Sequence, residues 1–215
     1  MDAQVEQFRA FSTTTISDAL DRLGVAGQAF GIVPLDRAFR LVGRAFTVRT
    51  IPVSTAGGSV GDYIDDVPPA SVIVLDNSGR LDATVWGDIL TTMAHRRAIA
   101  GTVIHGVCRD SVRSLELGYP IFSRGVYMRT GKDRVRADGY NVSVSLGEVR
   151  VEPGDLLVGD ADGVLVVPQG REAEVLGIAA EITEAEDRIR QEIEQGSRLD
   201  EARKRHRYFQ LQSRV

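Results

Sequence analysis

The order of apolar runs and helical segments in the middle of the chain is the sequence feature that most constrains the fold. Residues 71–75 and 102–105 form short, largely apolar runs of the kind found in strands buried on both faces of a sheet. A helical pattern over 88–100 separates these runs, and a second one over about 110–117 leads into the apolar run at 120–122. This alternation predicts right-handed βαβ crossovers and a largely parallel sheet in this half of the chain.

The ends and faces of these elements can also be predicted. The run 71–75 is followed directly by the turn-forming residues 76–79, which are expected to end the strand. Gly101 is expected to stop the helix over 88–100. One side of that helix is expected to carry Ile89, Leu90, Met93, Ala94 and Arg97.

The segment before this half predicts a helix and a strand. Residues 15–24 predict a short helix, with Ser17 or a nearby threonine able to cap its start and Gly24 suited to its end. Residues 41–53 mix β-branched and aromatic residues with alternating polar ones, which is typical of a strand.

Beyond residue 140 the pattern changes to short runs separated by turn signals. Residues 142–168 therefore predict short, mainly antiparallel strands. From residue 170 onward an apolar stripe at helical spacing predicts a helix that Gly196 can end, and a more polar helix is expected to follow. We expect an α/β protein with a single domain over 1–215 and C-terminal helices from about residue 170.

Composition and charge exclude several classes of protein. The chain has 215 residues, of which 43% are hydrophobic and 26% charged, as in ordinary globular proteins. Its net charge is −4, and the basic cluster at 203–207 is more typical of a solvated helix face than of a nucleic-acid-binding patch. The sequence shows no signal-peptide pattern, no apolar run of the ~20 residues needed to span a membrane, and a single cysteine, Cys108. We expect a cytoplasmic protein with no nucleic-acid or membrane partner.

Four residues in two pairs form the most informative candidate site. Gly87-Asp88 stands at the start of a predicted helix, and Arg109-Asp110 follows a buried strand after an interval of twenty residues. Because open α/β sheets place ligands at the carboxyl ends of their strands, the side chains of these residues are expected to converge there. Each has a simpler interpretation, since Asp88 could only cap its helix and Arg109 and Asp110 could be surface neighbours. Their combination at one sheet edge favours a functional site.

The residue types at this edge suit an oxo acid. The free N–H groups of Ile89 and Leu90, in the first turn of the helix, can bind a carboxylate. Arg109 offers a planar pair of donors for an oxygen anion, and Asp110 offers a hard oxygen ligand for a cation such as Mg²⁺.

The motif G-D-x20-R-D, at Gly87-Asp88 and Arg109-Asp110, resembles that of the RraA-like family, which includes class II aldolases acting on 4-hydroxy-4-methyl-2-oxoglutarate and 4-carboxy-4-hydroxy-2-oxoadipate. The resemblance extends over most of the chain, with further matches at residues 15–20, 101–106, 120–125, 151–155 and 159–164. It implies an α-β-β-α sandwich with a central swivelling-type β/β/α domain, assembled as trimers or as hexamers made of two trimers.

The resemblance also implies roles for particular residues. The position matching Asp110 ligates Mg²⁺ or Mn²⁺, that matching Asp88 holds water bound to the metal, and that matching Arg109 contacts the 2-oxo group of the substrate. The backbone after Asp88 would hold the pyruvyl carboxylate. A glutamate near the C-terminus of the adjacent subunit completes the site, and we place it at Glu186, with Glu184 as the alternative.

The activity implied is metal-dependent cleavage of 4-hydroxy-2-oxo acids to release pyruvate, with oxaloacetate decarboxylation as a second reaction through the same enolate. The alternative is a binding protein, because the family also includes regulators that bind the endoribonuclease RNase E and inhibit it. An intact Arg109-Asp110 pair does not distinguish these two functions.

Several other residues leave alternatives open. His105 stands where relatives are expected to carry an acidic residue, and it is interpreted as a strand-end packing or hydrogen-bonding residue rather than a site residue. Trp86 and Cys108 are interpreted as packing and bystander residues. The glycine-rich segment 57–62 is expected to be a connecting loop, with a backbone nest near the substrate as the alternative. Pro69-Ala70-Ser71 also departs from the family's usual P-G-D turn.

Overall fold

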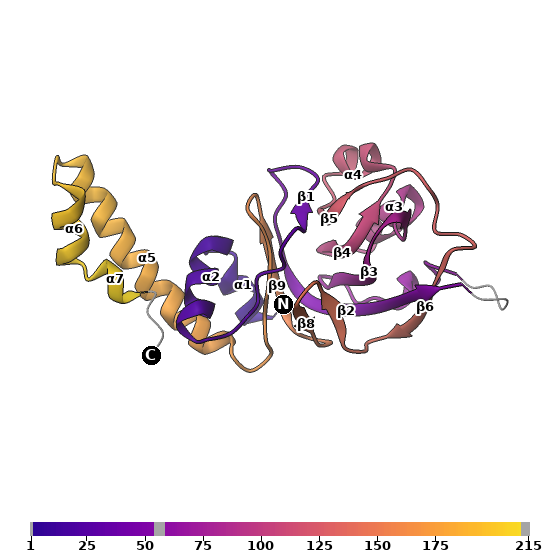
Figure 1. The fold of residues 1–215 in the computed structure, drawn as a ribbon, viewed down its shortest axis with the longest axis horizontal. Coiled ribbons are helices and arrows are strands. Elements are labelled where there is room, and N and C mark those ends of the chain that lie inside the picture. Colours follow the sequence, from indigo (N-terminus) through magenta and orange to yellow (C-terminus); the bar gives the residue numbers. More distant parts are fainter. Residues whose placement is uncertain (1, 54–58, 212–215) are drawn as a thin grey trace.

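A mixed β-sheet lies at the centre of the molecule in the computed structural model, which describes residues 2–53 and 59–211 (Figure 1). The strands of this sheet are β1 (Val33–Pro34), β2 (Leu41–Pro52), β3 (Val72–Thr84), β4 (Gly101–Cys108), β5 (Ile121–Val126), β6 (Val135–Tyr140), β9 (Leu156–Asp160) and β10 (Gly163–Val167). Their order is β1-β5-β4-β3-β2-β9-β10, with β6 paired to β2. β2, β3, β4 and β5 pair in parallel, which confirms the predicted crossovers.

The antiparallel half also agrees with the sequence pattern. β9 pairs antiparallel with both β10 and β2, and a separate antiparallel hairpin joins β7 (Val144–Leu146) to β8 (Val149–Val151). The fold is therefore α/β with parallel and antiparallel pairing.

Helices cover both outer faces of the strands. They are α1 (Ala3–Phe8), α2 (Thr13–Arg22), α3 (Asp88–Arg96), α4 (Ser111–Leu117), α5 (Glu172–Glu194), α6 (Leu199–Arg205) and α7 (Tyr208–Leu211), with a 3-10 turn, η1, at Ile64–Asp66. One buried cluster lies between the parallel strands and α3 and includes Ile73 and Ala94. A second joins the parallel strands to the hairpins, and a third packs α1, α2 and α5 on β9 and β10. These three clusters fill the three interfaces between the four layers of an α-β-β-α sandwich.

One predicted strand limit was wrong, and two strands were not predicted. β3 does not end at the turn residues after Leu75 but continues to Thr84. The turn forms, with Ser78 and Gly79 both at positive φ and the Ser78 N–H donating to the Asp76 carboxylate at 2.8 Å. The chain then returns to β4, so the turn is an irregularity within the ladder. β1 and β6 were not predicted because their pairing partners, β5 and β2, are distant in the sequence.

Helix positions also needed correction. α2 is capped by Ser12, whose side chain accepts from the Thr15 N–H, so Ser17 lies inside the helix. α3 ends at Arg96, and Gly101 begins β4 rather than stopping the helix. The short α1 was not predicted. Gly24 and Gly196 lie just beyond their helices at positive φ, as expected of helix-ending glycines.

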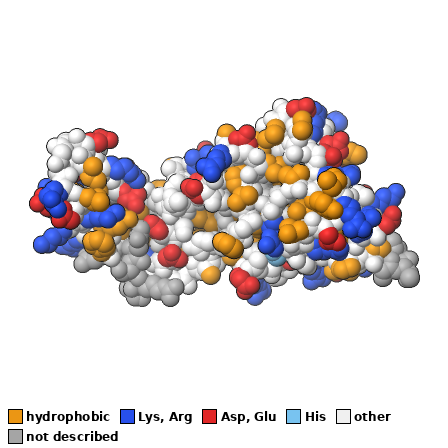
Figure 2. All heavy atoms as spheres, turned by 45° about the horizontal axis from the view of Figure 1, so that its top comes forward, with side chains coloured by type: hydrophobic (Ala, Val, Ile, Leu, Met, Phe, Trp, Pro, Cys, Tyr) orange, Lys and Arg blue, Asp and Glu red, His pale blue; other side chains and the backbone are white. Residues whose placement is uncertain are grey.

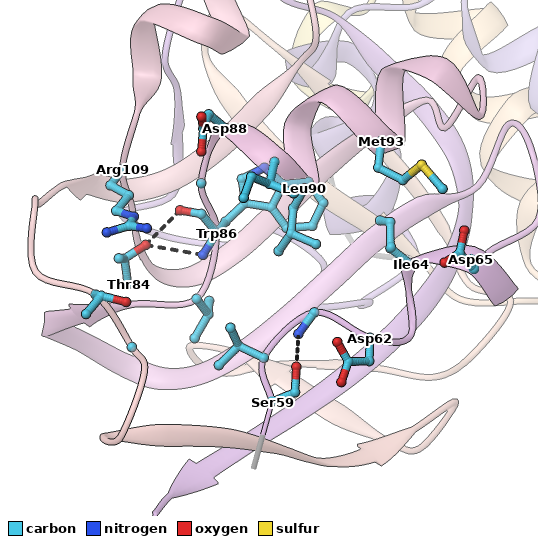
Figure 3. Close-up of a pocket in the computed structure, with 17 residues that line it drawn as sticks. Ser59, Asp62, Ile64, Asp65, Thr84, Trp86, Asp88, Leu90, Met93 and Arg109 are labelled. Atoms are coloured by element: carbon cyan, nitrogen blue, oxygen red, sulfur yellow. Dashed lines mark hydrogen bonds between the residues drawn. The ribbon is translucent and has the colours of Figure 1, made fainter. Parts of the chain in front are cut away.

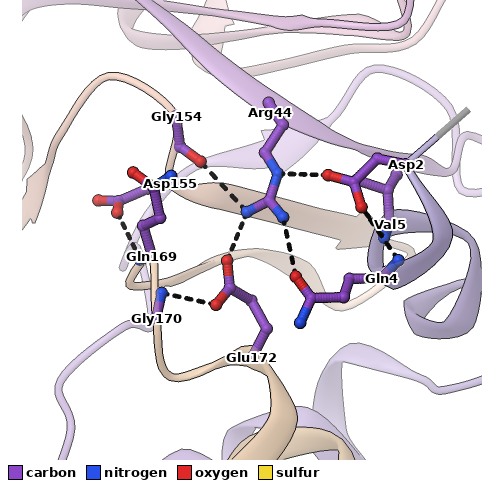
Figure 4. Close-up of polar contacts among 9 residues, drawn as sticks. All are labelled: Asp2, Gln4, Val5, Arg44, Gly154, Asp155, Gln169, Gly170 and Glu172. Carbon is purple, nitrogen blue, oxygen red and sulfur yellow. Dashed lines mark hydrogen bonds and ion pairs between the residues drawn. The ribbon is translucent and has the colours of Figure 1, made fainter.

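Arg44 on β2 ties the N-terminal segment and the start of α5 to the sheet (Figure 4). Its Nη1 lies 2.5 Å from Glu172 Oε1, and its Nε lies 2.8 Å from Asp2 Oδ2. Glu172, at the start of α5, is 3% exposed, and its second oxygen accepts from the Gly170 N–H at 2.6 Å. The buried carboxylate therefore has a donor on each oxygen, and it joins α5 to the sheet.

The C-terminal arm, residues 184–211, comprises the end of α5 together with α6 and α7 and projects from the body (Figure 1). It folds back as a hairpin, with α6 packed against α5. Across residues 2–53 and 59–211, none of the helices has the length and apolar character required to cross a membrane.

Candidate active site

The fold brings the two halves of the G-D-x20-R-D motif together. Asp88 is the first residue of α3, and Arg109 and Asp110 follow the end of β4. The Arg109 N–H donates to the Trp86 carbonyl at 2.9 Å, so the segment entering α3 is tied to the segment leaving β4. The convergence expected from the sequence is present at one edge of the parallel sheet.

The Asp110 carboxylate is held by two donors. Its Oδ2 accepts from the Asp88 N–H at 3.3 Å and lies 3.2 Å from Arg109 Nε. The side chain remains 40% exposed, which leaves room for a further partner. The backbone of Asp110 is left-handed, with φ 54°, a conformation that aspartate and asparagine tolerate better than most residues.

Gly87 makes this close approach possible. A Cβ at this position would lie 2.7 Å from Asp110 Oδ2 and 3.3 Å from Arg109 Nε. Its φ of −150° is ordinary extended backbone, so space rather than backbone freedom requires glycine here. Any side chain at position 87 would displace the Asp110 carboxylate.

A cavity of about 520 Å³ opens beside these residues (Figure 3). Gly87, Asp88, Ile89, Leu90 and Arg109, the predicted substrate-binding residues, all contribute to its lining. The first-turn N–H groups of α3 have no carbonyl four residues earlier within the helix, so they are available to an anion. The Ile89 side chain, expected on the same side of the helix as Leu90 and Met93, is 80% exposed.

The described part of one chain supplies few metal ligands. Within residues 2–53 and 59–211, no group of three or more His, Cys, Asp or Glu side chains is arranged to hold a metal ion. A half-exposed aspartate is nevertheless the kind of donor that Mg²⁺ uses, since that ion is usually bound by one or two carboxylates, with waters and substrate oxygens completing the shell. The space that the absent Cβ of Gly87 leaves beside Asp110 Oδ2 agrees with such a role.

Glu186 does not join this cluster within one chain. It lies on the C-terminal arm, and α5 and α3 lie at opposite ends of the molecule (Figure 1). Its Oε2 is 2.8 Å from Arg190 Nη2, an ion pair within α5, and Glu184 pairs in the same way with Arg188. The expected role of a glutamate from an adjacent subunit stays a prediction.

The other candidates differ in their relation to the cavity. His105 does not line it, and its Nδ1 lies 3.4 Å from Asp76 Oδ1. Trp86 is buried, stacks on Tyr119 and donates its indole N–H to Thr91 Oγ1, and it also lines the cavity. Cys108 is also buried, which raises the pKa of its thiol.

A further wall of the cavity was predicted only in part, since a backbone nest near the substrate was the alternative interpretation of the glycine-rich segment. Ser59 and Asp62, from the glycine-rich segment, and Thr130 and Gly131, from the loop after β5, also line it. Gly57 and Gly58 lie outside the described residues. The segment is thus more than a connecting loop, and the density of glycine before an acidic residue was the available signal.

Comparison with known proteins identifies the class. Residues 13–166 match the RraA-like family described as aldolase/RraA, and the chain belongs to this family. A solved structure of an uncharacterized protein from Pseudomonas syringae superposes with a TM-score of 0.88 at 42% identity, covering 94% of this chain and 98% of that one. The structure of Streptomyces coelicolor RraAS2, described as an unusual member of the RNase ES inhibitor RraA family, gives a TM-score of 0.81 at 28% identity, covering 87% and 95%.

Two sequence relatives are informative in different ways. Legionella pneumophila protein DlpA is 40% identical over 96% of this chain, but the chain spans only 34% of DlpA. A Halalkalibacterium halodurans protein, named provisionally as a 4-hydroxy-4-methyl-2-oxoglutarate aldolase, is 39% identical over 87% of this chain and 86% of its own length.

Proposed function

We propose that the protein is a divalent-metal-dependent lyase that cleaves 4-hydroxy-2-oxo acids and releases pyruvate. The observation that carries the proposal is the meeting of the α3 N-terminus, the Arg109 guanidinium and the Asp110 carboxylate beside one cavity. The Halalkalibacterium relative's name supports the same reaction class.

Each of these residues would have a separate role in carbon–carbon cleavage. The N–H groups of Ile89 and Leu90 would bind the substrate carboxylate, and Arg109 would donate to the 2-oxo oxygen. Cleavage removes the 4-hydroxyl proton, breaks the C3–C4 bond and leaves the bond's electron pair on the pyruvate enolate, whose negative charge the Arg109 guanidinium would stabilise. The exposed carboxylate of Asp88, at the cavity mouth, is our candidate for accepting that proton. Protonation of the enolate at C3 then gives pyruvate.

Asp110 is our candidate to hold Mg²⁺ or Mn²⁺. Such an ion would supply Lewis-acid polarisation of the 2-oxo group. Oxaloacetate, on losing CO₂, yields the same enolate, so the same residues would support its decarboxylation.

The first test is pyruvate release from 4-hydroxy-4-methyl-2-oxoglutarate, 4-carboxy-4-hydroxy-2-oxoadipate and oxaloacetate, coupled to lactate dehydrogenase. Turnover is expected with Mg²⁺ or Mn²⁺ and is expected to stop when EDTA removes the metal, returning when the metal is restored. Turnover that persists unchanged in EDTA would exclude the metal-dependent mechanism.

We further propose that the site is completed by a second copy of the chain in a trimer or hexamer. Large apolar side chains gather on the face of the body where α4 and β5 lie (Figure 2), and Val112, Val126 and Met128 are each more than half exposed. Exposed apolar surface of this kind is typical of protein interfaces. The exposed Ile89 at the cavity mouth adds to it. Glu186 lies on the projecting arm, where its side chain is 23% exposed and pairs with Arg190, so it would have to leave that pair to reach a neighbour's site.

Mixing two inactive variants tests the shared site. Asp110→Asn and Glu186→Ala are each expected to lose activity, and mixed oligomers formed by subunit exchange are expected to recover part of it, because some sites then combine intact residues from both chains. No recovery despite demonstrated exchange would contradict a shared site.

The alternative function, binding and inhibition of an endoribonuclease, is supported by the likeness to RraAS2. A regulator would act through its outer surface, so ribonuclease inhibition should survive Asp110→Asn and be lost on mutation of surface residues. Inhibition that depended on Asp110 would argue against this function.

A further inference from the structure

The cavity beside the proposed site, which Asp88 and Arg109 line but Asp110 does not, changes character along its length (Figure 3). Asp88 and Arg109 lie at one side, next to the N-terminus of α3. The apolar side chains of Ile64 and Met93 lie at the other side, Leu90 lies between the two sides, and Val60 also contributes to the lining. For a substrate whose carboxylate and 2-oxo group are held by Arg109 and the α3 N–H groups, the part of this cavity left for the C4 substituent is the side with Ile64 and Met93.

Charge is also uneven along the cavity. The apolar side carries the carboxylates of Asp62 and Asp65, whereas Arg109 is the sole cationic side chain among the described residues that line the cavity. Asp65 remains 67% exposed, and its nearest cation, Arg97, is 3.9 Å away, so its charge is only weakly compensated.

Nearby basic residues do not change this balance. The loop that contributes Thr130 and Gly131 also carries Lys132 and Arg134, but neither is among the residues that line the cavity. Arg134 donates through Nη1 to the carbonyls of Thr130 and Lys132, which holds its guanidinium against the loop.

From these features, and resting on the proposed function, we infer that the preferred substrates are 4-hydroxy-2-oxo monocarboxylates whose C4 substituent is an uncharged alkyl group. An alkyl group gains by leaving water for the walls formed by Ile64, Leu90 and Met93. A second carboxylate would lose its hydration against the same walls and would face Asp62 and Asp65. The aldehyde or ketone released with pyruvate would then be uncharged.

Binding of two non-cleavable probes of equal chain length tests the inference. Isothermal titration calorimetry in Mg²⁺ would compare 2-oxopentanoate with 2-oxoglutarate, which differ in having a methyl group or a carboxylate at the far end. We expect 2-oxopentanoate to bind at least about tenfold more tightly, the scale of one unfavourable charge contact. Equal or tighter binding of 2-oxoglutarate would overturn the inference.

Reversing the charge of Asp62 provides a second test of the inference. Asp62→Lys is expected to improve kcat/KM for 4-hydroxy-2-oxoglutarate relative to 4-hydroxy-2-oxopentanoate by about tenfold. Asp66→Lys is the matched control, because Asp66 is an exposed neighbour that does not line this cavity, and it is expected to leave the ratio unchanged. An unchanged ratio in Asp62→Lys, or an equal change in both variants, would contradict the proposed role of Asp62.

Failure of this inference can be distinguished from failure of the proposed function. Pyruvate itself has no C4 substituent, so Mg²⁺-dependent exchange of its methyl protons with D₂O reports enolate formation alone. Exchange combined with a preference for dicarboxylates would overturn the substrate class and leave the lyase proposal standing. Absence of exchange, with neither probe binding, would overturn both.

Discussion

Replacing Asp110 with asparagine is expected to lower kcat/KM for metal-dependent pyruvate release by about a thousandfold. The substitution removes the negative oxygen proposed to hold the cation but preserves the shape of the side chain. Asparagine also tolerates the left-handed backbone at this position, where φ is 54°. An alanine at position 110 would add about 1 kcal/mol of backbone strain, which makes asparagine the cleaner variant.

The matched control for this prediction is Glu116→Gln on α4, the helix that begins directly after Asp110. Glu116 is an exposed carboxylate that pairs with Arg113 at 3.2 Å and does not line the cavity. Its neutralisation is expected to leave kcat/KM within about twofold of wild type, because exposed ion pairs of this kind contribute little. Thermal unfolding of both variants establishes that they are folded. Wild-type activity in a folded Asp110→Asn protein would refute the assigned role.

Replacing Arg44 with methionine is expected to lower the free energy of unfolding by about 3 kcal/mol at neutral pH. The substitution leaves the Glu172 carboxylate, which is 3% exposed, without its cation. It also removes the contact to Asp2, so the attachments of both α5 and the N-terminal segment to β2 are weakened. Urea unfolding followed by circular dichroism measures the change.

The loss of unfolding free energy in Arg44→Met is expected to depend on pH in a defined direction. Burial of Glu172 acts to raise its pKa, but hydrogen bonds from Arg44 and from backbone N–H groups outweigh it, and the pKa is lowered from its ordinary value of 4.5. The stabilisation is therefore fully present above pH 4.5 and is lost as the pH falls through the lower, folded-state pKa. The difference between wild type and Arg44→Met is expected to narrow in that acidic range.

An exposed ion pair provides the control for Arg44. Arg9→Met breaks a solvent-exposed pair with Glu6 at 3.1 Å and is expected to cost less than about 0.5 kcal/mol. Equal costs for the two substitutions, or a difference that does not narrow in acid, would show that the Glu172 contact is not the source of the effect.

The parallel half of the fold could be predicted from the sequence because its signals are local. Buried strands such as 102–105 and helices such as α3 follow from the apolar pattern within about fifteen residues. The extension of β3 beyond its turn could not be predicted in this way. It depends on pairing between Arg80 and Gly106, and between Thr84 and Val107, which no local pattern specifies.

The residues of the candidate site also differ in whether local sequence signals predict their position. Asp88, Arg109 and Asp110 could be grouped from the sequence, because each lies at the end of an element whose place at the sheet edge follows from topology. The wall formed by Ser59 and Asp62 was predicted only as an alternative, from the density of glycine, since irregular segments carry no periodicity that would place them. The need for glycine at position 87 likewise emerged only from the structure, in which a Cβ at this position would lie 2.7 Å from Asp110 Oδ2.

The measurement that tests the central claim most directly is proton NMR of pyruvate in D₂O with the protein and Mg²⁺. Exchange of the methyl protons reports the enolate without requiring knowledge of the physiological substrate. We predict exchange well above the rate with Mg²⁺ alone, abolished by EDTA and by Asp110→Asn but retained in Glu116→Gln. Exchange no faster than with Mg²⁺ alone, or equal in wild type and Asp110→Asn, would contradict the proposal that Asp110 serves a pyruvate-forming lyase.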